Sequence, residues 1–289
     1  MKIAFSPCPN DTFVFHAWVH GLIPGAPELD VTYADIDITN SLAAGPNGPD
    51  VIKISYAALP WALADYALLP CGGALGRGCG PLVLTGGGTG KKDPVDKGLA
   101  VKDPEALSGR RVAVPSERST AYLLFRLWAA QQVQGGVGEI VVLPFHEIMP
   151  AVRDGVVEAG LVIHEARFTY PSYGLNLLTD LGTWWEADTG LPIPLGAIIA
   201  RRSLDLPAIT GWIRDSVRYA WAHPEASREY VLSHAQEMSP EVAEAHIELY
   251  VNEFTENLGE AGYKAVTALL SRASREGLIP EVDLKGLRF

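Results

Sequence analysis

The chain has 289 residues, and 48% of them are hydrophobic, which is enough for one large core or two of ordinary size. Its 34 Asp and Glu residues outnumber its 23 Lys and Arg residues, so the net charge at pH 7 is −11. An acidic chain of this kind is not expected to bind nucleic acid or an anionic membrane. It can still bind a small anionic ligand, because local N–H dipoles are able to hold a carboxylate.

The three cysteines, Cys8, Cys71 and Cys79, are sparse and widely spaced. Neither a disulfide framework nor a CxxC metal site is therefore expected. The first residues contain no apolar signal-peptide region, and no apolar run reaches the ~18 residues that a membrane span needs. We expect a cytoplasmic protein that binds no metal ion.

The most informative segment lies at the start of the chain. Residues 2–5 favour a strand, and Pro7 and Pro9 suit neither a strand ladder nor a helix interior. Asn10 and Asp11 are residue types that cap helix N-termini. The next helix is therefore expected to point its free N–H groups above the strand, in a geometry that binds anions. A cap and a tight turn without a ligand would explain the same residues.

Strand and helix patterns alternate along the first part of the chain. The expected elements are a strand at 29–34, a helix at 39–44, a strand at 51–54 and a helix at 56–66. A glycine-rich segment at 72–80 follows and shows neither pattern. It is not a phosphate loop, because it lacks the Gly-Lys-Ser/Thr ending.

A second α/β set begins after this glycine-rich segment. Its expected strands are 81–85, 111–114, 140–143 and 158–163, and its expected helices are 121–132 and 146–154. A polar loop at 86–104 has no assigned role. The last expected strand, 195–200, leads into helices at 207–222, 224–234, 240–250 and 260–275. Three of these helices carry proline near the first turn, where it is tolerated.

These patterns indicate an α/β protein of two lobes. Residues 1–80 and 196–289 are expected to form the larger lobe, with the C-terminal helices, and residues 81–195 the smaller lobe. Each lobe is expected to be a mixed, mainly parallel sheet flanked by helices. Ligands bind at the carboxyl ends of strands in open α/β sheets, so we expect an active-site cleft between the lobes, with hinges at the two crossings.

A lysine interrupts the apolar strand expected at 51–54. Burying an unpaired ammonium is costly, so Lys53 is expected to pair with an acid such as Asp11 or with a ligand carboxylate. The alternative is an edge strand on which Lys53 is solvated. Ser55 ends the strand, where its hydroxyl is well placed to contact a ligand.

Another apolar strand stops at His164 and Glu165. This position lies at the carboxyl end of the strand, and an imidazole can accept a proton near neutral pH. His164 is therefore a candidate general base, and a structural histidine is the alternative. Glu165 either orients the imidazole or is solvent-exposed.

Three further features leave two readings open. Thr120 follows a strand and a polar turn, so its hydroxyl and N–H either bind an anion or cap a helix. Arg77 either clamps a carboxylate or is a solvated residue of the crossing. Trp184 and Trp185 either form a wall for a ring or pack inside the protein.

The chain resembles the 1,4-dihydroxy-6-naphthoate synthases of the futalosine route to menaquinone. The motifs that carry this resemblance are SPCPNDTF at 6–13, KISYAA at 53–58, GGALGRGCGPL at 72–82, TAY at 120–122 and GLVIHEARFTYPSYGL at 160–175. The similarity runs nearly from end to end. Its chief departure is the polar insert at 86–104, which lies between motifs.

This resemblance implies a periplasmic-binding-protein type II-like fold that serves as a cytoplasmic lyase. It implies conversion of cyclic dehypoxanthine futalosine to 1,4-dihydroxy-6-naphthoate, with release of a sugar-derived fragment and without a metal or organic cofactor. His164 matches the family's proposed catalytic base, and Ser55, Thr120 and Ala121 match its ligand-contacting positions. The residues expected to bind the substrate are Ser6, Asn10, Asp11, Lys53, Ser55, Arg77, Thr120, Ala121 and Glu165.

Other functions are compatible with this fold. A transporter's solute-binding protein would bind a small carboxylate without turnover. The chorismate dehydratase of the same pathway shares the fold but lacks the SPCPNDTF start. A ligand-sensing domain is disfavoured because no DNA-binding segment is attached. The expected partner is a small carboxylate, and a homodimer remains open because the sequence shows no interface signal.

Overall fold

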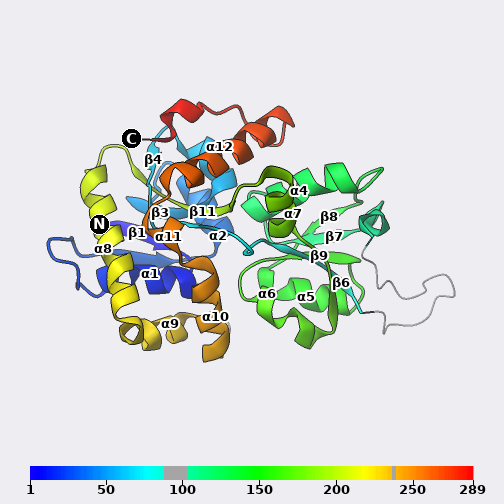
Figure 1. Ribbon diagram of the computed structural model, residues 1–289, viewed down its shortest axis with the longest axis horizontal. Helices are drawn as coiled ribbons and strands as arrows, with labels where there is room; N and C mark the ends of the chain where they lie inside the picture. The colour runs from blue at the N-terminus through cyan, green and yellow to red at the C-terminus, as the bar shows by residue number, and fades with distance from the viewer. Residues whose placement is uncertain (88–102, 236–238, 289) are drawn as a thin grey trace. The chain divides into compact units, whose positions relative to one another are not determined.

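The computed structural model describes residues 1–87, 103–235 and 239–288 (Figure 1). The chain divides into two compact units. Met1–Cys79 and Leu191–Phe289 form the first unit, and Gly80–Gly190 form the second. Most of the polar insert expected at 86–104 lies outside the described residues.

The first unit is built on a six-stranded sheet with the order β2-β1-β3-β11-β4, and β5 also pairs with β11. These strands are β1 (Lys2–Phe5), β2 (Asp30–Tyr33), β3 (Val51–Ser55), β4 (Tyr66–Leu68), β5 (Ala74–Gly76) and β11 (Ile193–Arg201). Strand β1 runs parallel to β2 and β3, whereas β11 is antiparallel to β3, β4 and β5. Since β3 lies between β1 and β11, all five of its residues are buried.

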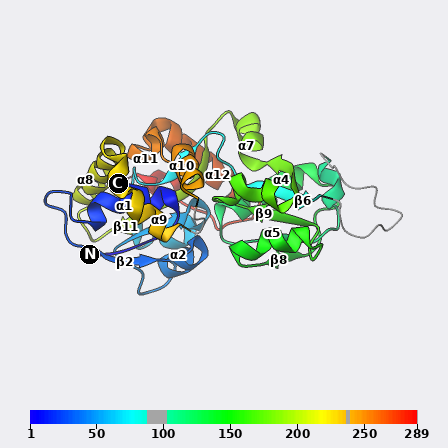
Figure 2. The same ribbon diagram turned by 90° about the horizontal axis from the view of Figure 1, so that it is seen from below.

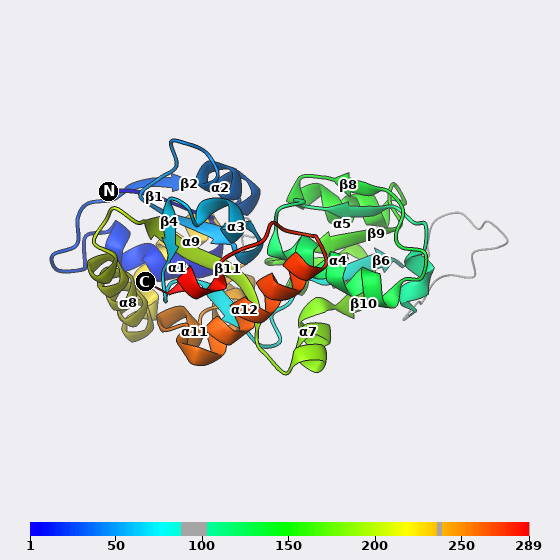
Figure 3. The same ribbon diagram turned by 90° about the horizontal axis from the view of Figure 1, so that it is seen from above.

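The first unit also contains several helices, some on the sheet and some on other helices (Figures 1 and 3). They are α1 (Pro9–Val19), α2 (Ile36–Ala43), η1 (Tyr56–Ala58), α3 (Leu59–Ala62), α8 (Leu206–Ala222), η4 (Pro224–Ser227), α9 (Arg228–His234), α10 (Pro240–Tyr250), α11 (Glu253–Glu256), α12 (Gly259–Arg275) and η5 (Leu284–Leu287). Helix α1 packs against α8, α9 and α10, while α12 packs against β11. Phe5 of β1 stacks on Phe15 of α1 with ring centroids 4.7 Å apart, which fixes α1 on the sheet.

The second unit has a five-stranded sheet with the order β10-β6-β9-β7-β8. Its strands are β6 (Leu82–Gly86), β7 (Val112–Val114), β8 (Ile140–Val142), β9 (Ala159–Val162) and β10 (Leu175–Asp180). Strands β7, β8 and β9 are parallel, and β6 is antiparallel to both β9 and β10. The unit's helices are η2 (Pro104–Leu107), α4 (Thr120–Gln132), α5 (Phe145–Arg153), α6 (Ala166–Thr169), η3 (Tyr170–Tyr173) and α7 (Leu181–Thr189).

Helices α4 and α5 both pack against β9 (Figure 2). A Cβ atom on Gly160 of β9 would lie 2.6 Å from the side chain of Ile148 and 2.8 Å from that of Val152. Glycine at this position therefore lets α5 approach the strand directly. The strand that leads to His164 is thus tightly packed on one side.

The α/β fold of two sheets with flanking helices confirms the predicted fold class, but several elements differ from the sequence analysis. The helix expected at 56–66 is wrong, because η1 and the four-residue α3 replace it and residues 66–68 form β4. Strand β5 was missed in the glycine-rich segment, because its pairing with β11 and the hydrogen bond from Asn252 Nδ2 to the carbonyl of Leu75 (3.0 Å) are tertiary contacts.

The segment between β9 and β11 was also missed; it contains α6, η3, β10 and α7. Strand β10 pairs with β6 through a register shift between Leu177 and Thr179, which breaks the alternation on which strand prediction relies. In the described part of the chain, no helix is long and apolar enough to cross a bilayer.

Acid sensitivity is expected from the rings that pack between α1 and α9. The ring of His16 lies 4.4 Å from that of His20 and 5.6 Å from that of Tyr230, and burial together with His20 lowers the pKa of His16 below 6.5. The folded state therefore holds this imidazole neutral. Its contribution to the free energy of unfolding is complete above pH 6.5 and is lost as the pH falls below that value.

We expect the urea midpoint of the wild-type protein to fall more steeply from about pH 7 to pH 5 than that of the His16→Gln variant. His223→Gln is the control, because His223 belongs to the same unit and is exposed. Equal slopes for wild type and His16→Gln would contradict the assignment.

Candidate functional site

Three predicted residues of the first unit lie where β1 and β3 end. Ser6 follows β1, Asp11 lies in the first turn of α1, and Ser55 is the last residue of β3. Because β1 and β3 are parallel and paired, with Ile3 opposite Val51, their carboxyl ends meet at one edge of the sheet. The sequence therefore positions these polar groups together through the strand register.

Asp11 is the centre of this polar group. Its Oδ2 accepts a hydrogen bond from Ser6 Oγ (2.7 Å), and its Oδ1 accepts one from Asn10 Nδ2 (2.8 Å) and forms an ion pair with Lys53 Nζ. All four side chains are buried. The predicted pairing of Lys53 with Asp11 is confirmed, and the alternative of a solvated lysine on an edge strand is wrong because β3 is an interior strand.

Few N–H groups remain for an anion in the first turn of α1. Pro9 has no N–H, and the N–H groups of Asp11 and Thr12 both donate to the carbonyl of Cys8 at 3.1 Å. The positive end of the helix dipole instead stabilises the carboxylate of Asp11, which lies in the first turn. The dipole of α1 therefore already stabilises a carboxylate of the protein itself, and less of its field remains for a bound anion.

Gly196 of β11 makes room for the side chain of Lys53. The two residues lie on adjacent strands, and a Cβ atom on Gly196 would lie 2.7 Å from Lys53 Cε. A contact this short would move the ammonium group away from Asp11. Glycine at position 196 therefore leaves the Lys53 side chain in its place beside Asp11.

Asn40, which lies in the helix expected at 39–44, holds Ser55. Its Oδ1 accepts the N–H of Ser55 (2.8 Å), and its Nδ2 donates to the hydroxyl oxygen of Ser55 (3.1 Å). Asn40 is buried in α2, whereas Ile38 and Leu42 of the same helix are exposed. This reversed distribution of polar and apolar residues becomes visible only once α2 packs beside β3, so the sequence alone carries no signal for Asn40.

Arg77 is exposed on the turn that follows β5. Its expected role as a carboxylate clamp remains a prediction.

In the second unit, Thr120 and Ala121 begin α4, and both are buried. The cap is Ser119, whose Oγ accepts the N–H of Tyr122 (3.1 Å), so Thr120 is not the N-cap residue. The first intrahelical bond runs from the N–H of Leu123 to the carbonyl of Ser119. The N–H groups of Thr120 and Ala121 precede that bond, at the end of the helix where an anion is favoured.

His164 follows β9 and has a φ of 54°, the only positive value among the non-glycine residues that the structure describes. A left-handed backbone costs an L-residue roughly 1–3 kcal/mol and is concentrated at functional sites. The half-buried imidazole packs edge-on against the ring of Phe145, with centroids 5.7 Å apart. The next residue, Glu165, is buried, so the expectation of a solvent-exposed Glu165 is wrong.

The two tryptophans after β10 serve packing. Trp185 is fully buried, and Trp184 Nε1 donates a hydrogen bond to Gln131 Oε1 (3.2 Å), which joins α7 to α4. The packing interpretation of this pair agrees with these contacts.

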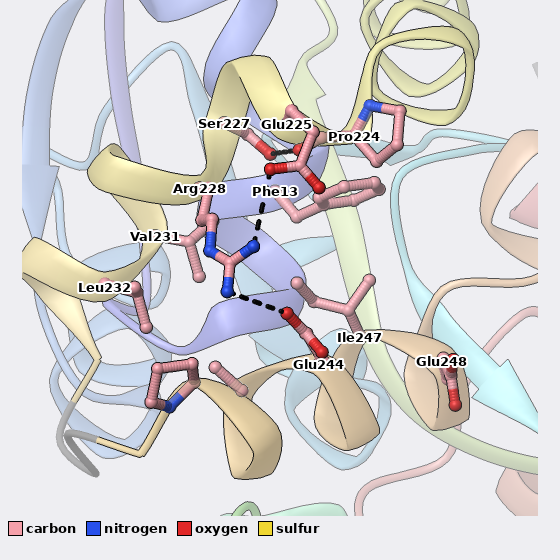
Figure 4. A pocket seen from close by; sticks show the side chains of 12 residues that line it. Phe13, Pro224, Glu225, Ser227, Arg228, Val231, Leu232, Glu244, Ile247 and Glu248 are labelled. Atoms are coloured by element: carbon pink, nitrogen blue, oxygen red, sulfur yellow. Dashed lines mark hydrogen bonds and ion pairs between the residues drawn. The ribbon is translucent and has the colours of Figure 1, made fainter.

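A cavity of about 310 Å³ lies elsewhere in the first unit, between α1, η4, α9 and α10 (Figure 4). Phe13, Val231 and Ile247 give it apolar walls, and Arg228 at its rim forms ion pairs with Glu225 and Glu244 (3.4 Å each). It is lined by none of the predicted site residues of the described chain, and its lining carries one arginine, Arg228, against Glu225, Glu244 and Glu248, so its charge does not favour the expected carboxylate ligand. We therefore assign it no chemistry.

Comparison with known proteins places these residues in a family context. The chain matches the model of a menaquinone biosynthesis family over residues 1–275. It is 64% identical to the 1,4-dihydroxy-6-naphthoate synthase of Streptomyces coelicolor, covering 100% of this chain and 98% of that protein. It is 46% identical to the synthase of the same name from Thermus thermophilus, covering 96% and 95% of the two chains.

Solved structures show the same fold. A protein from Archaeoglobus fulgidus superposes with a TM-score of 0.84 at 32% identity, covering 96% of this chain and 98% of its own. The periplasmic aliphatic sulphonate-binding protein of Escherichia coli superposes with a TM-score of 0.67 at 13% identity, covering 100% and 91%. The second likeness concerns the fold alone, and it confirms the expected periplasmic-binding-protein-like fold.

The Asp11–Lys53 pair yields a prediction about stability. Asp11→Asn leaves a buried ammonium without its counter-charge, so we expect the free energy of unfolding to fall by about 3–5 kcal/mol. The double variant Asp11→Asn/Lys53→Met removes both charges and should be more stable than the sum of the two single effects predicts. Urea denaturation of the four proteins measures this coupling.

The control pair is Arg218 and Glu256, which lies in the same unit at 2.6 Å with side chains 60% and 31% exposed. Glu256→Gln should cost less than about 1 kcal/mol, because water screens an exposed pair. Additive effects of the Asp11 and Lys53 substitutions would show that the two charges do not depend on each other.

Proposed function

Because the chain belongs to the menaquinone biosynthesis family, we propose that it is a lyase that converts cyclic dehypoxanthine futalosine to 1,4-dihydroxy-6-naphthoate. The observation that carries this proposal is the 64% identity, over the whole chain, to a protein named 1,4-dihydroxy-6-naphthoate synthase. The chain is an enzyme of menaquinone biosynthesis on the strength of both named relatives. Cleavage of a carbon–carbon bond is the more specific part of the proposal.

His164 is proposed as the general base. Its imidazole would accept a proton from the substrate as the sugar-derived fragment leaves, and the ring system that remains becomes an aromatic naphthalenediol. Aromatisation supplies much of the driving force, so the protein needs mainly a positioned base and hydrogen-bond donors. A positioned base contributes roughly 10²–10⁴-fold to the rate. The left-handed backbone at the end of β9 supports this role, because such strain is concentrated where chemistry occurs.

The substrate carboxylate is proposed to bind at the start of α4. Thr120 and Ala121 supply two N–H groups at the positive end of a 13-residue helix, and Thr120 adds a hydroxyl. The start of α1 suits this task less well, because its dipole already stabilises Asp11. The same donors would stabilise negative charge that develops in the transition state.

In the first unit, Ser55 is proposed to contact the substrate through its hydroxyl. Ser6, Asn10 and Lys53 are proposed to contribute polar contacts while Asp11 holds them in place, since each of them bonds to its carboxylate. Arg77 and Glu165 complete the proposed set. The reaction is proposed to need no metal or organic cofactor.

We place the reaction in the cytoplasm as part of the same proposal. Three buried cysteines outside any disulfide and an acidic composition suit a protein of a reducing compartment. The alternatives, a solute-binding protein and a chorismate dehydratase, are not favoured, because both named relatives are naphthoate synthases.

His164→Asn tests the base. Asparagine tolerates a left-handed backbone better than most residues, so the fold should persist. We expect kcat to fall by about 10²–10⁴-fold while substrate affinity stays within a few-fold. Naphthoate formation by the purified protein, followed by absorbance, gives the rate, and calorimetry with the substrate gives the affinity.

His146→Asn is the matched control, because His146 belongs to the same unit and its side chain is 78% exposed. A wild-type kcat for His164→Asn would reject the base. Wild-type protein that binds the substrate but releases no naphthoate would favour a binding protein over an enzyme.

Ser55 and its partner Asn40 should act as one unit in substrate binding. Ser55→Ala removes the proposed contact, and we expect KM to rise by about tenfold, which corresponds to about 1.4 kcal/mol for one lost hydrogen bond. Asn40→Ala should raise KM in the same direction because it releases Ser55, and the double variant should add little further. Ser41→Ala on the exposed side of α2 is the control, and its KM should not change. Independent, multiplicative effects of the Asn40 and Ser55 substitutions would show that Asn40 does not act through Ser55.

A further inference from the structure

We propose that Arg167 is a positioning residue for His164, which it holds in place by fastening α6 to Asp180 and to the carbonyl of Gly80. This inference rests on the proposed role of His164 as the base. It concerns the second unit alone, in which His164, Arg167 and both anchoring residues lie.

His164 needs an external restraint. Its backbone is left-handed, and such a conformation persists only when the surrounding structure over-determines it. Locally, the carbonyl of His164 accepts the N–H of Arg167 (3.3 Å), and that of Glu165 accepts the N–H of Phe168 (2.9 Å). These bonds begin α6, which has only four residues, and a single helical turn is not stable by itself. Side chains that leave this turn can therefore add to its restraint.

The side chain of Arg167 supplies two strong anchors. Its Nη2 bonds to Asp180 Oδ2 at 2.6 Å, and its Nη1 donates to the carbonyl of Gly80 at 2.8 Å. The side chains of Arg167 and Asp180 are only 19% and 13% exposed. Charge-assisted bonds are about twice as strong as neutral ones, and the planar guanidinium fixes the direction of both.

The anchor points are themselves rigid. Asp180 caps α7, because its Oδ1 accepts the N–H groups of Gly182 (2.8 Å) and Thr183 (3.2 Å). Gly80 lies directly against this cap: a Cβ atom on Gly80 would be 2.0 Å from the nitrogen of Gly182. No side chain fits between the two segments, so their separation is fixed.

One guanidinium therefore joins three segments of the second unit. Gly80 is the first residue of the unit, and α7 ends next to Gly190, its last residue. The turn that carries His164 is thus bonded to Gly80, where the chain enters the unit, and to Asp180, which caps α7, the last helix of the unit. A displacement of about 1 Å at a catalytic group can reduce the rate by 10²-fold, so this restraint matters for turnover.

A second Arg–Asp pair in the same unit provides a matched control. Arg153 bonds to Asp154 through Nε (2.7 Å) and Nη2 (3.0 Å), but the two side chains are 50% and 55% exposed at the end of α5. Both are Arg–Asp ion pairs, but the Arg153 pair is exposed and does not anchor α6. A loss of kcat that appears in Arg167→Met and not in Arg153→Met therefore cannot be a general effect of removing an ion pair.

The experiment measures kcat, KM and the urea midpoint of purified variants. We expect Arg167→Met to lower kcat by about 10–100-fold with KM changed less than threefold, because the base is displaced while the substrate contacts remain. Arg167→Lys, which keeps the charge but not the fork, should recover part of kcat. Asp180→Asn keeps an oxygen for the cap of α7 and should lower kcat while the protein stays folded. Arg153→Met should match the wild type.

Two comparisons make the test decisive. In a His164→Asn background, Arg167→Met should reduce the residual rate less than threefold, because its effect passes through the imidazole. An equal loss in both backgrounds, or a wild-type kcat for folded Arg167→Met, would overturn the inference. If Arg167→Met does not fold, the kcat values of Asp180→Asn and Arg167→Lys are compared in the same two backgrounds, and wild-type values would overturn the inference. If His164→Asn itself keeps the wild-type kcat, the proposed base fails, whatever Arg167 does.

Discussion

The ion pair between Asp11 and Lys53 is the interaction on which the polar site of the first unit depends. Removing two charges from water is costly, and the cost is offset only when geometry is good and the remaining lone pairs are satisfied. Ser6 and Asn10 satisfy the carboxylate, and Gly196 leaves the space through which the lysine reaches it. The segments that carry Asp11, Lys53 and Gly196 are remote in sequence, so all three have to fit one carboxylate.

The second unit controls its candidate base by different means. His164 follows β9 with a backbone in a strained, left-handed region. The strain is held by the turn of α6 and by an arginine three residues later, which bonds to segments at the start of the unit and at the cap of α7. Buried charge thus fixes the polar groups of one unit, and a strained turn with a remote anchor fixes the imidazole of the other. Substitutions of the anchor should affect rate more than binding.

The sequence predicted the parts of the structure that have strong local signals. Pro7 and Pro9 located the break between β1 and α1, and the cost of a buried ammonium predicted the partner of Lys53. Strand β5 and the bulged β10 were missed, because pairing with distant strands determines them. Asn40 was missed because an asparagine inside a short helix has no local meaning until β3 lies beside it. Arg167 was missed for the same reason. Its partners, Gly80 and Asp180, lie in other segments of the chain.

Net charge alone does not decide where this protein can hold an anion. The chain carries a charge of −11, and its buried lysine is already neutralised by Asp11. The dipole of α1 is likewise committed to that carboxylate. The proposed place for a carboxylate ligand is therefore the start of α4, where the N–H groups of Thr120 and Ala121 precede the first intrahelical bond. Such dipoles act over about one helical turn, so they can hold an anion without making the surface attractive to nucleic acid or to an anionic membrane.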